Sequence, residues 1–106
     1  MKIKFSRLAI EDLDLIYNFY SENSDINGIE QIKLIKNTID YLSIFPKMGK
    51  ELSEIINDRS FNECEYRVII VKKRFFVVYY LFNNEIIVSR IFSSKQNYTQ
   101  ILIEMF

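Results

Sequence analysis

The spacing of apolar residues changes once along the chain, around the stretch FPKMGKEL at residues 45–52. Before this stretch, apolar residues recur every three or four positions, which is the period of a helix that buries one face. After it they form the β-branched and aromatic runs EYRVIIV, RFFVVYYLF and EIIVSRIF, which are typical of strands. The sequence therefore predicts a helical first half and a β-sheet behind it. The only proline and one of the two glycines stand at the boundary.

The first half is predicted to form a short strand and an antiparallel pair of helices. MKIKF alternates apolar and basic residues, as a half-buried strand does, and Ser6 is suited to cap the helix that follows. The apolar positions of that helix are Ala9, Leu13, Ile16, Tyr17 and Tyr20. A second helix is expected from about residue 28 to residue 44, and its acidic residues, like those of the first, are expected on solvated faces. The apolar stripe of the second helix is Ile32, Ile35, Ile39 and Leu42.

The second half is predicted to be a three-stranded antiparallel meander. Pro46 has no amide hydrogen and ends the second helix, and Gly49 is expected to supply a positive φ. Lysines at 72–73 and asparagines at 83–84 mark the two chain reversals. We expect the two helices to cover one face of the sheet and the other face to look outward, at least in part. The last segment, residues 95–106, is expected to close the domain as a short helix or to lie along the sheet.

Length and composition favour one cytoplasmic α+β domain over residues 1–106. The chain has 106 residues, of which 49% are hydrophobic, and no apolar run approaches the ~20 residues that cross a bilayer. The first residues turn acidic too soon for a signal peptide. Cys64 is the only cysteine, so an internal disulfide is impossible, which fits a reducing compartment.

The charges balance in total but not along the chain. The chain has fourteen basic and fourteen acidic residues, yet residues 67–95 contain six basic residues and a single acidic one, Glu85. A basic surface of this kind attracts an acidic partner or a nucleic-acid backbone, although the lysines at 72–73 equally fit solvated hairpin charges. We expect Arg67, Arg90 and Lys95 to lie close together on the open side or at one end of the sheet. The alternative is that Arg90 pairs with a helix carboxylate such as that of Glu11 or Asp14.

Several kinds of chemistry are excluded by residues that the chain lacks. It has no histidine, which excludes Ser-His and Cys-His catalysis and histidine-based zinc sites. It contains neither of the usual glycine-rich phosphate loops. No cofactor and no metal are therefore expected. Tyrosine, lysine and arginine remain, and these side chains act near phosphates.

The order of these features resembles the RelE/ParE superfamily of toxins from bacterial type II toxin–antitoxin modules. FSRLAIEDLDLIYNFY is similar to the first helix of that family, and LSIFPKMGKEL to the Leu…Phe-Pro…Gly stretch after its second helix. EYRVIIV matches an arginine-bearing strand, and YYLFNNEIIVSRIFSSKQNYTQIL resembles the end of the family's chain. The resemblance covers nearly the whole sequence. It implies a RelE/ParE-like fold and no cofactor.

The resemblance also indicates candidate site residues. It implies five target-binding residues. If the protein is a ribonuclease, four of these five, all except the strand residue Tyr79, are also expected to be catalytic. The target-binding residues are Arg67, Tyr79, Arg90, Lys95 and Tyr98. Lys95 replaces the usual arginine, and Ser93 stands where mRNA-cleaving relatives carry a histidine or tyrosine that takes part in the chemistry.

Three functions follow from the resemblance. The first is a ParE-like toxin that binds and poisons DNA gyrase without being an enzyme, which the missing histidine, Ser93 and the near-neutral charge favour. The second is a RelE-like toxin that cuts mRNA in the ribosome, which the basic residues and Tyr98 favour because a scissile phosphate needs charge stabilisation. The third is an inactive relative that only binds partners. Each implies a cognate antitoxin whose C-terminal segment wraps the toxin, in a heterotetramer or beside a toxin dimer.

Overall fold

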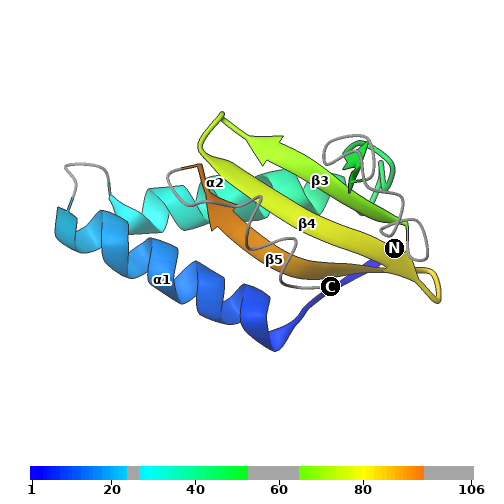
Figure 1. Cartoon of the computed structure of the whole chain (residues 1–106), viewed down its shortest axis with the longest axis horizontal. Helices are drawn as coiled ribbons and strands as arrows, with labels where there is room; N and C mark the ends of the chain where they lie inside the picture. Colours follow the sequence, from blue (N-terminus) through cyan, green and yellow to red (C-terminus); the bar gives the residue numbers. More distant parts are fainter. Residues whose placement is uncertain (24–26, 53–64, 95–106) are drawn as a thin grey trace.

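The computed structural model describes residues 1–23, 27–52 and 65–94, and it has the α+β arrangement that the sequence predicts. Two helices pack on one face of a single five-stranded sheet whose strand order is β1-β5-β4-β3-β2 (Figure 1). The elements are β1 (Lys2–Phe5), α1 (Arg7–Asn23), α2 (Gly28–Tyr41), β2 (Lys50–Glu51), β3 (Tyr66–Val71), β4 (Phe75–Phe82) and β5 (Glu85–Ser93). The expected C-terminal helix and Cys64 fall outside the described residues.

The antiparallel meander β3-β4-β5 is confirmed, with both reversals where the sequence places them. All four residues of the two turns have positive φ: 51° and 59° at Lys72 and Lys73, and 50° and 61° at Asn83 and Asn84. These left-handed pairs match the twist of a two-residue hairpin. Asparagine tolerates this conformation, whereas lysine adopts it at a cost of roughly 1–2 kcal/mol per residue.

The sheet is mixed, whereas the sequence predicted an antiparallel one. β1 pairs in parallel with the first half of β5, from Lys2 opposite Glu85 to Phe5 opposite Val88. A parallel partner is possible here because the whole helical pair and the rest of the sheet separate β1 from β5 in sequence. β2 is only two residues long and pairs with β3. It was not predicted, since two residues are too few to show a period.

Helix α1 begins as the sequence predicts. The amide of Ala9 donates to Ser6 Oγ at 3.0 Å, so Ser6 is the N-cap. Ala9, Ile16 and Tyr20 are buried against the sheet and Leu13 is partly buried. Tyr17 is exposed, so its assignment to the buried stripe is wrong.

Helix α2 starts at Gly28 as predicted, but it ends at Tyr41 rather than near residue 44. Asn27 caps its start, with its Oδ1 accepting from the Ile29 amide at 2.8 Å. At the other end the amide of Leu42 donates to Ile39 O, and the chain then continues in turns up to Pro46. The α2 stripe is buried at three positions, Ile35, Ile39 and Leu42, and Ile32 is partly buried.

Gly49 is needed for space and not for a positive φ. No glycine of the described part has a positive φ, so the predicted reason is wrong. A Cβ at Gly49 would lie 2.9 Å from both Cε1 and Oη of Tyr79 and from the carbonyl oxygen of Val68. Real Cβ atoms essentially never approach other atoms this closely, so the chain after α2 passes Tyr79 and Val68 with room for glycine only.

The core has a large part between helices and sheet and a small part on the opposite face. Leu52, Val68, Val78 and Phe92 form the small cluster, so the face away from the helices is not simply open. Ile70 and Phe82 on that side are exposed. No helix of the described part is long and apolar enough to span a membrane.

Candidate functional site

Arg90, expected to face a target, is held by a carboxylate of α1. Its Nε donates to Asp12 Oδ2 at 2.8 Å and its Nη2 to Asp12 Oδ1 at 3.0 Å. The guanidinium carbon lies 4.9 Å from the centre of the Phe92 ring. The hydrogen bond to Asp12 raises the pKa of Arg90. The prediction that the acidic residues of the helices are solvated is therefore wrong for Asp12, which is buried.

Asp12 also closes part of an exposed sheet edge. β1 pairs only with residues 85–88 of β5, so in the described structure the following stretch of β5 pairs with β4 on one side and has no strand on its other side. Residues of α1 and its cap replace that strand. Ser6 Oγ donates to Ser89 O at 2.7 Å, and the amide of Ile91 donates to Asp12 Oδ2 at 2.9 Å. These bonds use backbone groups that a strand edge otherwise presents to another chain.

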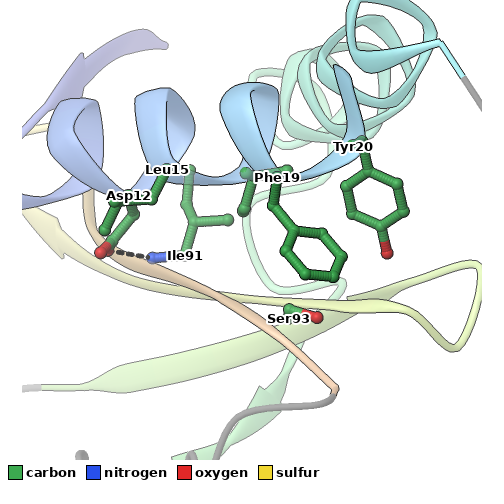
Figure 2. Close-up of a pocket in the computed structure, with 7 residues that line it drawn as sticks. Asp12, Leu15, Phe19, Tyr20, Ile91 and Ser93 are labelled. Atoms are coloured by element: carbon green, nitrogen blue, oxygen red, sulfur yellow. Dashed lines mark hydrogen bonds between the residues drawn. The ribbon is translucent and has the colours of Figure 1, made fainter. Parts of the chain in front are cut away.

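An apolar groove of about 450 Å³ lies beyond this contact, between α1 and the end of β5. Figure 2 shows Asp12, Leu15, Phe19 and Tyr20 extending from α1 over β5. The ring of Tyr20 meets Phe19 and Phe75 edge to face, at centroid distances of 5.3 and 5.8 Å, and forms part of the floor. Leu15 is 65% exposed although it lines the groove. The other residues that line the groove are Ile16, Ile91 and Ser93.

Arg67 and Tyr79 hold the chain that follows α2 onto the sheet. The Tyr79 hydroxyl donates to Pro46 O at 2.8 Å and accepts from the Gly49 amide at 3.0 Å. Arg67 Nη1 donates to Gly49 O at 2.7 Å, and its Nη2 contacts Glu65 at 2.9 Å and Glu51 at 3.5 Å. Burial raises the pKa of Tyr79, and the hydrogen bond from Arg67 lowers the pKa of Glu65.

The structure does not bring Arg67 and Arg90 together. Arg67 lies opposite Tyr79, which packs on the helix side of the sheet, whereas Arg90 lies opposite Val78, which belongs to the cluster on the other face. Side chains opposite each other in an antiparallel pair share a face, so the two arginines leave the sheet on different sides. Lys95 and Tyr98 fall outside the described residues. The alternative for Arg90, a helix carboxylate, was the better expectation, with Asp12 as the partner.

The groove itself was missed by sequence reasoning, although a signal for its exposed residues Leu15 and Phe19 exists. Leu8, Leu15 and Phe19 fall on one helical face with Asp12, at offsets of seven and eleven residues from Leu8. Such a stripe indicates a second apolar face on α1, next to the one that packs on the sheet. Asp12 breaks the stripe, and its tertiary partner was not visible from helical spacing.

Both arginines of the described sheet are bound by groups of the protein itself. No group of three or more metal-ligating side chains occurs among them. Arg67 is committed to Glu51, Glu65 and backbone carbonyls, and Arg90 to Asp12. Each guanidinium is thus held by acceptors of the protein itself.

The arrangement of two helices on a five-stranded sheet is that of a toxin fold. It is similar to a chain of the chromosomal ParDE TA system from P. aeruginosa, with a TM-score of 0.67 and 21% sequence identity. The match covers 88% of this chain and 95% of that chain, and at this identity it shows the fold. The family model "ParE toxin of type II toxin-antitoxin system, parDE" matches residues 3–98. The chain belongs to this ParE toxin family, within the RelE/ParE superfamily that the sequence resembles.

One further relative matches only a segment. A transaldolase from Prochlorococcus marinus (strain MIT 9312) is 44% identical over 48 residues, which is 45% of this chain. The chain spans 14% of the length of that enzyme. A match to so small a share gives no ground for assigning its activity here.

Proposed function

We propose that this type II toxin arrests growth by binding and poisoning DNA gyrase in the cytoplasm, without itself catalysing a reaction. The observation that carries the proposal is the commitment of both sheet arginines to carboxylates of the protein itself, on opposite faces of the sheet. A ribonuclease needs cations that converge where charge develops on the phosphate, and a group that transfers a proton. The chain has no histidine, and the resemblance implies that Ser93 stands where mRNA-cleaving relatives carry a histidine or tyrosine that takes part in the chemistry.

A cognate antitoxin is the proposed partner, and the groove between α1 and β5 is its proposed binding site. The groove is lined mainly by apolar side chains, and Leu15 is exposed there although it is apolar. A partner segment with apolar side chains at helical spacing fits such a groove, and a short strand fits the edge of β5 beside it. Asp12 and Ser6 already use two backbone groups of that edge, so the helical mode is favoured.

Induced expression without antitoxin tests the mechanism. We expect DNA breaks and a damage response while protein synthesis continues at early times, and we expect the purified toxin to inhibit DNA supercoiling by gyrase. Early translation arrest with cut mRNA would instead show that the gyrase proposal is wrong. In that case Tyr98 becomes the first residue to test for proton transfer, with Arg67, Arg90 and Lys95 as candidates for phosphate contacts.

The groove is tested separately by substituting Leu15 with glutamate. A charge at this exposed groove position should weaken neutralisation by the antitoxin at least tenfold while the toxin still arrests growth. Ile10→Glu is the matched control, because Ile10 is an exposed aliphatic residue of the same helix that does not line the groove. Equal neutralisation of both variants would place the antitoxin elsewhere.

A further inference from the structure

Three consecutive cations form the turn between β3 and β4. Lys72, Lys73 and Arg74 are all exposed, and we call these three side chains the basic turn. Both lysines have positive φ, at 51° and 59°, which is a costly conformation for a residue with a Cβ. The other two-residue turn of the sheet uses Asn83 and Asn84, which tolerate it. Local folding therefore does not explain the lysines, and strain retained in a native structure points to a role for the side chains.

The positive charge of the basic turn is not neutralised within the described residues. No ion pair of the described part involves any of its three side chains. Arg74 Nη1 donates to Gln31 Oε1 at 3.1 Å, so the guanidinium is fixed against α2 by an uncharged group that is buried. The exposed charges at the end of α1 and the start of α2 do not change this balance. With Glu22, Glu30 and Lys33 included, four cations still stand against two acids.

The basic turn adjoins the groove between α1 and β5 (Figure 1). The amide of Ser94 donates to Arg74 O at 2.6 Å. The preceding residue, Ser93, lines the groove and lies opposite Phe75 in the sheet. The ring of Phe75 in turn contacts Tyr20 in the groove floor. A peptide segment that leaves the groove at the end of β5 therefore reaches the basic turn at once.

Resting on the proposed antitoxin site in the groove, we infer that this site extends onto the basic turn, and that the antitoxin segment carries acidic residues directly beside its apolar ones. The apolar side chains fill the groove, and the carboxylates bind the two lysines and the remaining N–H groups of Arg74. The groove supplies no competing free carboxylate, because Asp12, the charged residue in its lining, is paired with Arg90. Charges beside an apolar contact accelerate association and set specificity.

A nucleic-acid backbone is the other polyanion that the basic turn would attract. Proteins that bind DNA through its backbone commonly make about 6–10 phosphate contacts, whereas the basic turn offers three cations. The surface beside it is also an apolar groove, which apolar side chains fill and phosphates do not. The geometry thus favours an acidic peptide, and a DNA probe in the test addresses the other case.

The test replaces both lysines of the basic turn with asparagine, the residue that the other turn uses. The double variant Lys72→Asn/Lys73→Asn removes two charges and suits the left-handed backbone, so its thermal midpoint should not fall. Lys47→Asn/Lys50→Asn is the matched control. It also removes two exposed lysines, but near the start of β3, at the opposite end of that strand. Each full-length variant is titrated with the purified cognate antitoxin at about 0.1 M and at about 1 M salt.

We expect the basic-turn variant to bind the antitoxin about fivefold or more weakly than wild type at the lower salt concentration. Exposed charge pairs each contribute modestly, so two lost lysines give an effect of this order. The difference should disappear at the higher concentration, where the Debye length is only about 3 Å. The control should bind as wild type does under both conditions.

The Leu15→Glu variant separates this inference from the groove proposal. If Leu15→Glu weakens antitoxin binding and the basic-turn variant does not, the inference is wrong and the groove proposal stands. If the basic-turn variant and the control weaken binding equally, net charge accounts for the effect and the inference is again wrong. If Leu15→Glu binds normally, the antitoxin lies outside the groove and both fail. Lost binding to a short DNA duplex, with antitoxin binding unchanged, would identify the basic turn as a nucleic-acid surface instead.

Discussion

Removal of the Asp12 carboxylate tests the central ion pair of this fold. Asp12→Ala deletes three hydrogen-bond acceptor contacts, two with the guanidinium of Arg90 and one with the amide of Ile91. It leaves a charged side chain that is only 18% exposed without its partner. Breaking a buried pair from one side costs about 3–5 kcal/mol, and the partial exposure of Arg90 places the expected loss near the lower end, at about 3 kcal/mol.

Urea denaturation measures this loss. With an m-value of about 2 kcal/mol/M, the midpoint should fall by about 1.5 M, with m unchanged if the unfolded state is unaffected. Asp14→Ala is the matched control, because Asp14 is an exposed carboxylate on the same helix and should change stability by less than about 0.5 kcal/mol.

A double-mutant cycle with Arg90→Ala isolates the pair itself. The double variant should lose clearly less stability than the two single variants added together, since the second substitution removes a charge that the first has already left without its partner. If Asp12→Ala is no more destabilising than Asp14→Ala, or if the effects of Asp12→Ala and Arg90→Ala are additive, the ion pair does not stabilise the fold.

Four further changes have definite expected outcomes. Ile39→Ala should cost ~2–5 kcal/mol in a urea titration, because the side chain is fully packed between α2 and the sheet; an unchanged midpoint would contradict that packing. Gly49→Ala should destabilise by ~1–3 kcal/mol, because its Cβ would overlap Tyr79; a neutral result would show that the turn moves freely. Lys73→Gly should stabilise by about 1 kcal/mol by relieving a left-handed lysine, which thermal denaturation would detect as a raised midpoint. Burial raises the pKa of Tyr79 above its usual value of 10.0, so its contribution to stability is complete below pH 10 and is lost as the pH rises further. Tyr79→Phe should remove that part of the alkaline loss while costing about 1–2 kcal/mol at neutral pH, and an unchanged alkaline profile would contradict this assignment.

Local patterns in the sequence determined the elements of this protein. The helical period, the Ser6 cap, the strand runs and the two reversals were all predicted within a few residues of their observed positions. These features depend on neighbours three or four residues away on a helix, or on alternate residues along a strand. The order of the motifs was enough to indicate the superfamily, because the order of the elements sets the fold.

Tertiary structure alone decided what the site residues do. Arg90 and Asp12 lie 78 positions apart, and no period connects them. The same holds for Tyr79 and Arg67, which fix a turn that lies 18 or more residues away in sequence, and for Gly49, whose small size matters only because Tyr79 crosses beneath it. Periodicity reports that a face is buried, but it does not report which groups meet there. The charge excess of residues 67–95 thus suggested one basic surface. In the structure, carboxylates outside that stretch lie against both arginines, Asp12 against Arg90 and Glu51 and Glu65 against Arg67, because a cation with little exposure needs a partner.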